Sequence, residues 1–591
     1  MIDWLHPSIL FIFGALLIPF LKGRLQQILL VTIPVLSILS VFFMNEGVYW
    51  SFNFLGSQLV FGKVDKLSIV FAWVFTIASL IGMVYALHVK DSGQHIAAFL
   101  YISGSLGVTF AGDFFSLFIF WELMAFASAF LIFAKRDKPA IDAGYRYILV
   151  HIFGGVCLLG GIIIHTVKTG STAFGLLTQD GSLSFYLILI GFILNAAVPP
   201  LHAWLTDAYP EGTVTGSVFM SAFTTKTAVY VLVRAFPGTE LLVWMGTIMA
   251  LYGVVYAVLE NDCRRLLAYH IISQVGYMVA GVGIGTDMSL NGSVSHAFAH
   301  ILYKGLLFMG AGAVIFMTGK RKLTELGGLY QTMPITLTLY MIGGFAISAF
   351  PLFSGFVTKS MVVAGASHDH RPAVALLLTL ASAGTFLHTG LKLPYYMFFG
   401  KDSGIKAQEP PLNMLVAMGM SASLCIGIGV LPGVLYKLLP FPVHFNPYTG
   451  EHVTSALGIL LFTGLGFFML LKKLDPEPTI SADTDWVYRK GSRLFMWFAN
   501  KPLAIYEDYL SNIYNRWFSK YILKISDFLG YVFDSKFIDG IVNGIAKCFI
   551  SLSLVVRKTQ SGLVRNYAFC MLLATVVVIG YYLFKIYSKI S

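Results

Sequence analysis

Long apolar runs separated by short polar breaks recur from Ser8 to Leu471, and one more follows at Tyr567–Tyr587. A helix needs about 20 apolar residues to cross a ~30 Å hydrocarbon core. The runs reach this length, so the pattern predicts an all-α polytopic membrane protein with about sixteen transmembrane helices. Composition agrees, because 57% of the residues are hydrophobic and 12% are charged, and the charged share of soluble domains is about twice as large.

Helix-breaking prolines interrupt two of the apolar runs, at Pro199-Pro200 and at Pro351. Interrupted helices in corresponding places of two halves are typical of inverted repeats in transporters. We therefore expect two inverted repeats with broken helices, each forming a half-channel, at 96–236 and 241–399. The other predicted segments are N-terminal spans (1–95), C-terminal spans (400–474), a lateral segment (475–566) and a final transmembrane helix (567–591).

The lateral segment 475–566 mixes aromatic and charged residues, for example Trp486 with Arg489 and Trp517 with Lys520. This composition is typical of amphipathic helices that lie along a membrane surface. A small soluble domain is the alternative interpretation. It is less favoured because interface aromatics are so frequent here.

Lysine and arginine in short loops mark the cytoplasmic side of a membrane protein. Most of the basic clusters, including Lys135-Arg136, Arg264-Arg265 and Lys320–Lys322, fit one topology in which the N-terminus lies outside. We expect an inner, cytoplasmic or plasma membrane. The net charge of +11 indicates anchoring to the inner leaflet, and nucleic-acid binding is the poorer explanation because no basic soluble domain is evident.

Motifs for bound cofactors are missing from the sequence. The five cysteines, at positions 157, 263, 425, 548 and 570, lack metal-ligand spacing, so we expect no metal site and no cofactor in this chain. The chain also lacks a dinucleotide fingerprint and a phosphate-binding P-loop. An ion gradient or a partner subunit must therefore supply the energy.

His296, His300 and Lys304 share one stripe of an apolar helix, because positions i, i+4 and i+8 lie above one another over roughly 12 Å. Ionisable groups inside a bilayer cost at least ~2.5 kcal/mol each and usually mark ion pathways. By the same criterion the candidate pathway residues are Glu122, Lys226, His296, His300, Lys304, Lys359 and Lys392. Possible accessory residues are Asn195, His202, Asp207 and His388. The alternatives are a structural ion pair or a neutral, packed side chain at Glu122, a satisfied core histidine, and lysines that snorkel to an interface.

Several motifs resemble the antiporter-like subunits of respiratory complex I, Mrp-type sodium/proton antiporters and membrane-bound hydrogenases. The resemblance covers nearly the whole chain and rests on Phe120–Leu123, Pro200–Leu205, Thr225–Tyr230, Arg264–Tyr269, His296–Gly312, Gly327–Leu329 and Pro351–Phe356. It implies two five-helix inverted repeats and a hydrated polar axis through the candidate residues. The segment Gln560–Ala568 is similar to the distal complex I subunit, in which a long lateral helix precedes the last span.

One position departs from the family pattern. The family usually has a lysine in its seventh span, just before the helix break, and this chain has Asn195. We hypothesise that Lys226 pairs with Glu122 in its place. The alternative is a first half-channel that conducts poorly.

Three functions remain open at this point. The first is a proton- or Na⁺-translocating subunit of a redox-driven complex, with other membrane subunits and peripheral flavin and iron-sulfur subunits as partners. The second is an Mrp-like antiporter subunit without a redox partner. The third is a non-conducting membrane anchor. No redox centre is expected in this chain, and protons fit a carboxylate and lysine axis better than Na⁺ does.

Overall fold

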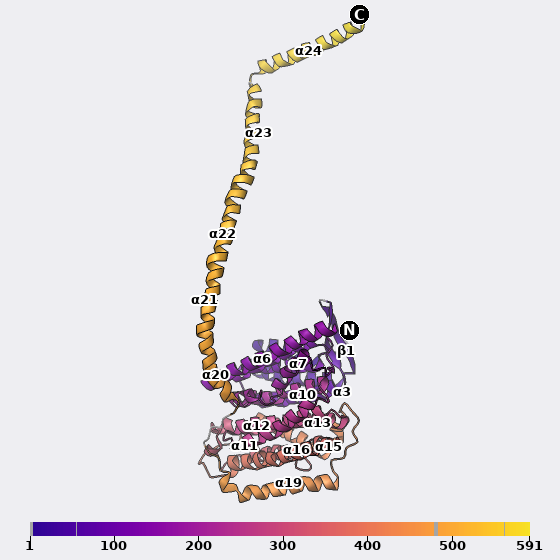
Figure 1. Cartoon of the computed structure of the whole chain (residues 1–591), viewed down its shortest axis with the longest axis vertical. Helices are drawn as coiled ribbons and strands as arrows, with labels where there is room; N and C mark the ends of the chain where they lie inside the picture. The colour runs from indigo at the N-terminus through magenta and orange to yellow at the C-terminus, as the bar shows by residue number, and fades with distance from the viewer. Residues whose placement is uncertain (1–3, 55, 478–482, 561, 591) are drawn as a thin grey trace. The chain divides into compact units, whose positions relative to one another are not determined.

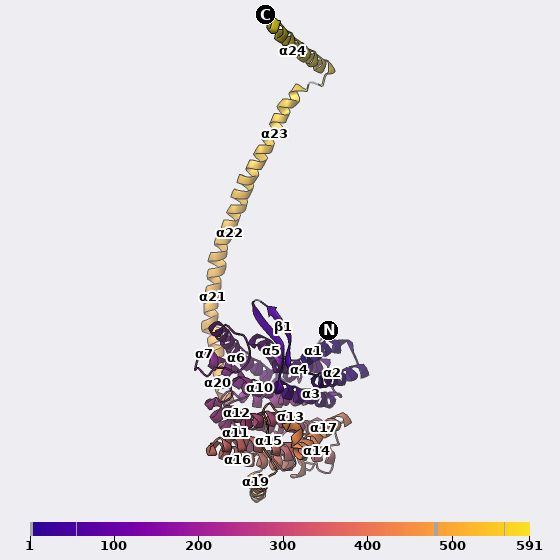
Figure 2. The ribbon, with the colours of Figure 1, turned by 90° about the vertical axis from the view of Figure 1, so that its right-hand side faces the viewer.

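The computed structural model describes residues 4–54, 56–477, 483–560 and 562–590. The chain forms two compact units, Met1–Trp486 and Val487–Ser591. The first unit is a bundle of helices, and Figures 1 and 2 show the first half of its sequence, in violet, packed beside the second half, in rose to orange.

The helices before the first break and the short elements that follow it are α1 (Pro7–Leu17), α2 (Arg24–Phe42), α3 (Lys66–Ala86), α4 (Ser92–Phe110), α5 (Phe114–Phe133), α6 (Lys138–Thr169), α7 (Leu183–Asn195), α8 (Ala203–Ala208), α9 (Val214–Ala222) and α10 (Thr224–Ala235). The second half contains α11 (Glu240–Leu259), α12 (Cys263–Ile284), α13 (Asp287–Thr318), α14 (Pro334–Ile347), α15 (Ser354–His368) and α16 (Pro372–Thr385). Helix α16 continues through π-helical segments Phe386–Lys392 and Tyr395–Phe399. The first unit closes with α17 (Leu412–Val430), α18 (Pro432–Tyr436) and α19 (Gly450–Met469).

Length and composition support the membrane prediction. Among the described residues, 13 helices are long and apolar enough to cross a membrane, and Pro7–Phe20, Leu183–Asn195 and Pro334–Ile347 are shorter apolar helices. On the outer helices large apolar side chains are exposed, as at Leu461 and Phe462 of α19. In water such a surface would be unfavourable, and lipid tails are its natural solvent. The chain is an integral multi-pass membrane protein.

The two halves of the bundle repeat one local design. Helix α13 begins and ends 149 positions after α6, and each helix closes on a left-handed glycine, Gly170 or Gly319. Helix α12 begins 149 positions after α5, and the aspartate before each, Asp113 or Asp262, caps it by accepting bonds from backbone N–H groups. The same two aspartates also form equivalent isolated β-bridges, to Ala173 and to Lys322. This supports the predicted repeat.

The two breaks also share one geometry. Two residues beyond the end of α7, Ala197 has a positive φ, and Ala349 has the same φ two residues beyond α14. In each break the following backbone N–H donates to the carbonyl oxygen five residues earlier. These hydrogen bonds run from Val198 to Ile193 and from Phe350 to Phe345. Such a turn satisfies the last carbonyls of a helix and ends it. The helix breaks predicted near Pro199-Pro200 and Pro351 are therefore present.

One element departs from the all-helical expectation. Strands β1 (Gly47–Phe54) and β2 (Ser57–Val64) form an antiparallel hairpin. Polar and aromatic residues alternate over Ser51–Phe54 of β1, as is typical of a strand, and the side chains of this part are exposed. The hairpin is short and lies in a loop between α2 and α3, so the helical architecture is unchanged.

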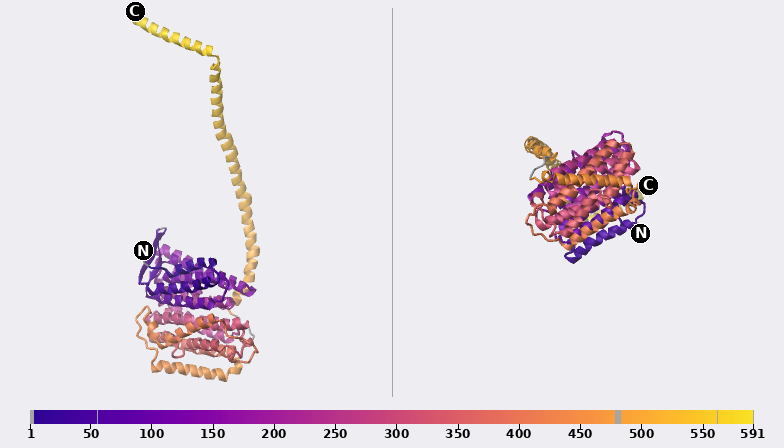
Figure 3. Two further views of the ribbon diagram at one scale, coloured as in Figure 1. Left: turned by 180° about the vertical axis from the view of Figure 1, so that it is seen from behind. Right: turned by 90° about the horizontal axis from the view of Figure 1, so that it is seen from below.

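The second unit consists of the long helix and a final helix. Its elements are α20 (Asp485–Phe498), α21 (Ala504–Asn512), α22 (Ser519–Phe528), α23 (Asp539–Thr559) and α24 (Val564–Ile590), joined from α20 to α23 by π-helical segments Ala499–Leu503, Ile513–Phe518 and Leu529–Ile538. Residues Arg489–Lys558 form 70 continuous helical residues (Figure 3). At 1.5 Å per residue such a helix far exceeds the thickness of a bilayer.

Candidate functional site

The central element of the site is the column His296, His300 and Lys304 on α13, whose three side chains are fully buried. The His296 Nδ1 lies 3.0 Å from the Thr358 hydroxyl of α15. Among the described residues, neither nitrogen of His300 has a hydrogen-bond partner, and neither does Lys304 Nζ, which lies 5.9 Å from the Phe308 ring centroid. The predicted column exists, and its last two members are not used in structural bonds.

A second pair of histidines lies on neighbouring helices. His388 follows α16, and its ring centroid lies 6.3 Å from that of His270 on α12. Both rings are buried, and all four ring nitrogens lack a hydrogen-bond partner in the part of the chain that the structure describes. Lys392, one turn beyond His388, donates to the carbonyl oxygens of Val258 and Glu260, at 2.6 and 3.4 Å. It therefore binds the C-terminal end of α11, where a cation is favoured, and does not snorkel.

Lys359 lies on α15, just beyond the second break. Its ammonium donates to the carbonyl of Ile347, the last residue of α14, at 2.9 Å. It also lies 5.2 Å from the Tyr277 ring centroid. A cavity of ≈ 610 Å³, whose lining includes Ser382 and His452 among apolar side chains, reaches this lysine. The break thus supplies a backbone acceptor for the lysine beside a space large enough for water.

In the first half, Glu122 projects from α5 onto α6. A Cβ added to Gly155 would lie 2.2 Å from Glu122 Oε1, so only glycine leaves room for this carboxylate. That oxygen is buried without a hydrogen-bond partner among the described residues. The cation predicted to pair with it is elsewhere: Lys226 Nζ donates to the Ser221 carbonyl at 2.6 Å and to the Thr225 hydroxyl at 3.0 Å.

The predicted Glu122–Lys226 ion pair is therefore absent from this structure, which describes both residues. The physical reason is a second interruption that the sequence pattern concealed. The apolar run that contains Lys226 splits at Phe223 into α9 and α10. Splitting exposes carbonyls at the end of α9, and the Lys226 ammonium satisfies one of them.

Two accessory candidates lie around the first break. Asn195 is the last residue of α7, and its buried Nδ2 has no hydrogen-bond partner within the described ranges. Asp207, on α8, accepts two hydrogen bonds from Arg146 of α6, at 2.6 and 3.0 Å. A bidentate pair of this kind fixes geometry, so Asp207 joins α8 to α6.

His202, directly after the first break, contacts the segment that follows α19. Its Nε2 donates to Asp483 Oδ1 at 3.1 Å, and both side chains are fully buried. The hydroxyl groups of Tyr252 and Tyr269 donate to the same carboxylate. Burial raises the pKa of Asp483, but the charge and hydrogen bonds of His202 and the tyrosines lower it below its ordinary value.

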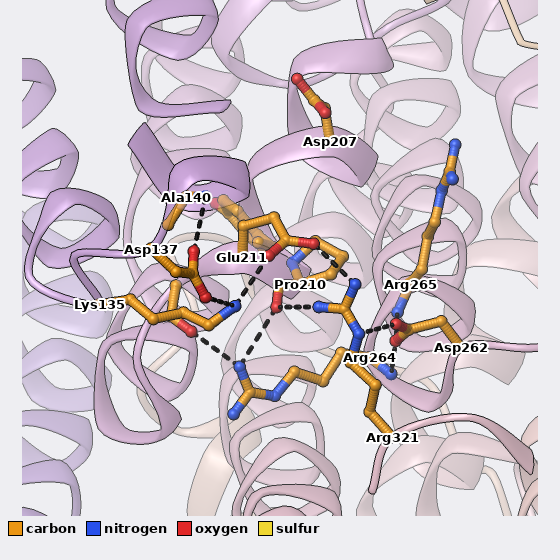
Figure 4. Close-up of polar contacts among 12 residues, drawn as sticks. Lys135, Asp137, Ala140, Asp207, Pro210, Glu211, Asp262, Arg264, Arg265 and Arg321 are labelled. Atoms are coloured by element: carbon orange, nitrogen blue, oxygen red, sulfur yellow. Dashed lines mark hydrogen bonds and ion pairs between the residues drawn. The ribbon is translucent and has the colours of Figure 1, made fainter. Parts of the chain in front are cut away.

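Loops from four connections meet at one end of the bundle. Figure 4 shows Glu211, which follows α8, between Lys135 and Arg321, each 2.8 Å from its carboxylate. Arg321 also pairs with Asp262, at 2.7 Å. Burial raises the pKa of Glu211, and the two cations outweigh it, so the net shift is downward. The loops after α5, α8, α11 and α13 therefore lie on one face, as the predicted topology requires.

Two residues of the site were missed in the sequence. His270 follows the Arg264–Tyr269 motif within an apolar run, so the criterion of ionisable residues in spans could have found it. Asp483 could not be found in this way, because it lies in the polar segment after α19 and 281 positions from His202.

Known proteins with related sequences include an antiporter subunit and a hydrogenase component. One is a protein of the Na⁺/H⁺ antiporter of Alkalihalophilus pseudofirmus, to which the chain is 25% identical over 574 residues, covering 88% of this chain and 67% of that protein. The other is hydrogenase-4 component B of Escherichia coli, to which it is 29% identical over 450 residues, covering 68% of this chain and 67% of that protein.

A solved structure shows the same fold. One polypeptide of the membrane-bound sulfane sulfur reductase, an archaeal respiratory membrane complex, superposes with a TM-score of 0.67 at 24% identity, over 97% of this chain and 99% of that one. The family described as NADH:quinone oxidoreductase/Mrp antiporter, transmembrane, matches residues 111–385. That range contains the column of α13, the two breaks and the candidates from Glu122 to Lys359. The similarity to the NADH:quinone oxidoreductase/Mrp antiporter transmembrane family therefore covers the part of the chain that carries most of the candidate residues.

Proposed function

We propose that this chain translocates protons as a membrane subunit of a multi-subunit, redox-driven complex. The observation that carries the proposal is a series of buried polar atoms that lack protein partners among the described residues. They are Glu122 Oε1, Asn195 Nδ2, Thr227 Oγ1, both nitrogens of His300, Lys304 Nζ, both nitrogens of His270, Ser273 Oγ, both nitrogens of His388 and Thr389 Oγ1.

A buried polar group without a partner costs about 1–3 kcal/mol, and a charged one costs more. Native proteins retain few such groups, and each needs a reason. Water bridging these atoms would satisfy them and carry protons between them. A non-conducting anchor has no use for a string of unsatisfied basic nitrogens in its core, so the third function considered above is the weakest.

The proposed mechanism is charge coupling along the axis. A change of charge beside Glu122 alters the electrostatic potential at Lys304, which passes its proton through water towards Lys359 or Lys392. Shifting the pKa of a side chain by one unit requires only about 1.36 kcal/mol. Desolvation or a nearby like charge can shift a pKa by several units. Basic nitrogens predominate among the unpartnered atoms, and Na⁺ prefers a cage of oxygen ligands, so protons are the proposed ion.

We propose that the face carrying Lys135, Glu211 and Arg321 is cytoplasmic. Its loops hold the basic clusters that mark the inside of a membrane protein. The N-terminus then lies outside, as does the hairpin β1–β2. Figure 4 shows Lys135, Glu211 and Arg321 close together, which supports a single face for their loops. The assignment of that face to the cytoplasm rests on the excess of lysine and arginine in cytoplasmic loops.

Lys304→Ala tests translocation directly. The native complex carrying this substitution, reconstituted in vesicles and assayed with a pH-sensitive dye, should lose driven proton uptake while remaining assembled. Lys320→Ala, in the exposed loop after α13, is the matched control and should transport normally. Wild-type proton flux in Lys304→Ala would refute the proposal.

A second function is a component of an antiporter without redox partners. The Na⁺/H⁺ antiporter relative, which matches 88% of this chain, favours it. Purification from native membranes in mild detergent, with measurement of flavin and iron-sulfur absorbance, separates the two. Redox subunits alongside the chain support the pump, and small membrane subunits alone support the antiporter.

A further inference from the structure

The repeat of 149 positions pairs the α13 column with three residues of α6. Because α6 and α13 begin and end at equivalent positions, His296, His300 and Lys304 correspond to Tyr147, His151 and Gly155. The histidine in the middle is common to both halves. The sequence criteria passed over His151, and the function proposed above does not use it.

His151 is 3% exposed, and its two ring nitrogens differ. The Nδ1 lies 2.9 Å from the Tyr147 carbonyl oxygen. A carbonyl can only accept, so Nδ1 carries a hydrogen and donates it. The Nε2 is buried without a hydrogen-bond partner among the described residues. It is therefore the atom at which this ring can gain and lose a proton.

The surroundings of His151 bring it close to the acid of the first half. Glu122 Oε1 occupies the space where a side chain at position 155 would begin, one helical turn from His151. In the second half Lys304 fills the equivalent position. Each half thus combines one histidine with one charged group at the same place, and the charge is carried by α5 in the first half and by α13 itself in the second.

Hydroxyl groups lie beside both His151 and Lys226. The His151 ring stacks on Tyr147, with centroids 4.0 Å apart, and Tyr147 Oη lies 2.7 Å from the Ser128 hydroxyl. Thr224, next to Thr225, lies 2.6 Å from Tyr101 Oη, and the same Thr224 side chain also interacts with Tyr147. Thr225 accepts from Lys226.

Other titratable groups lie on the elements that pack against α6. On the elements packed against it they are Glu122 of α5, Tyr186 of α7, Asp207 of α8, and Tyr209 and Glu211 of the short helix Tyr209–Glu211. Arg146 holds Asp207, and Lys135 and Arg321 hold Glu211. Among the carboxylates of this group, all of which the structure describes, Glu122 alone has an oxygen that is buried without a partner.

We infer that His151 is a proton-exchanging residue of the first half-channel, equivalent in position and role to His300. A proton bound at Nε2 converts the ring to imidazolium, one helical turn from the place on α6 that the Glu122 carboxylate occupies. Loss of the same proton restores the neutral ring. The inference rests on the proposed translocation function. It assigns a titrating group to the half that lacks a lysine at position 195.

The substitution His151→Asn separates this role from a structural one. An asparagine Nδ2 superposes on histidine Nδ1, so it keeps the bond to the Tyr147 carbonyl and removes Nε2. His151→Gln places an uncharged amide near Nε2 and serves as the second variant. His165→Gln, further along α6, is the matched control. All are made in the assembled complex, and driven proton flux is measured in vesicles from about pH 5.5 to 8.5, the range in which histidine charges change.

We expect His151→Asn and His151→Gln to lower the flux about tenfold or more and to change its pH profile, with normal assembly and with His165→Gln unchanged. One outcome would overturn the assignment of His151 and leave the proposed function standing. In that outcome Lys304→Ala abolishes the proton flux, whereas His151→Asn has normal flux and an unchanged pH profile. Normal flux in Lys304→Ala would instead refute the proposed function.

Discussion

Asp483 accepts a hydrogen bond from His202 across 281 positions of sequence, in a site where neither side chain is exposed. His202 ends the first helix break, and Asp483 stands in the segment between α19 and α20. With Tyr252 and Tyr269 donating to the same carboxylate, four segments of the chain converge on one acid. The polar C-terminal connection is thereby attached to the broken helix of the first half.

Removing the charge at Asp483 should weaken this attachment. In Asp483→Asn the carboxylate that accepts from His202, Tyr252 and Tyr269 is replaced by an amide, whose nitrogen cannot accept. Leaving a buried donor without its acceptor costs about 1–3 kcal/mol. We expect a clearly lower thermal midpoint in detergent, measured by loss of the monodisperse complex on heating. Asp508→Asn, an exposed position of α21, is the control and should leave the midpoint unchanged. Equal midpoints for the two variants would contradict the role given to Asp483.

Gly155→Ala should disturb Glu122 specifically. The added methyl group would lie 2.2 Å from Glu122 Oε1, so the carboxylate must move away from its present position. Gly160→Ala on the same helix is the matched control, because its nearest neighbour would lie 3.9 Å away. We expect reduced proton flux in Gly155→Ala alone. Similar flux in both variants would show that the position of Glu122 does not limit transport.

Lys226→Ala should cripple transport, and Asn195→Ala should have a mild effect. Lys226 holds the carbonyl at the end of α9 and adjoins the hydroxyl groups of Thr224 and Thr225, whereas the Asn195 amide makes no hydrogen bond through its Nδ2 to any described residue. Flux in reconstituted complexes should fall about tenfold or more in the first variant. Near-normal flux in Lys226→Ala would remove this lysine from the pathway.

The loop cluster around Glu211 should lose stability in acid. Its pKa is lowered in the folded protein from an ordinary 4.5, so its contribution is present above that value and is lost as the pH falls through the folded pKa. We expect the difference in thermal midpoint between wild type and Glu211→Gln to be constant from about pH 7 to 5.5 and to shrink below about pH 4.5. A difference that persists unchanged in acid would show that Glu211 is not ionised in the folded protein.

Much of the site was predictable because burying a charge in a membrane is costly. Ionisable residues are therefore rare in apolar runs, and each one stands out in the sequence. The column of α13 and the positions of Glu122, Lys359 and His388 follow from single ionisable residues in apolar runs. The partners of these residues were not predictable in the same way. Lys226 was expected beside Glu122 and instead binds a carbonyl created by the split at Phe223, and Lys392 was open to snorkelling and instead binds the end of α11.

The sequence by itself determined what is local: the spans, the two helix breaks, the charged loops and the spacing of His296, His300 and Lys304. Hydrophobic length and helical periodicity act over about 20 residues, so one segment is enough to show them. Only the tertiary structure decided which segments meet, as with Asp483 and His202, His270 and His388, or Glu122 and Gly155. Those pairs depend on how helices far apart in the chain pack together, and no local pattern records that choice.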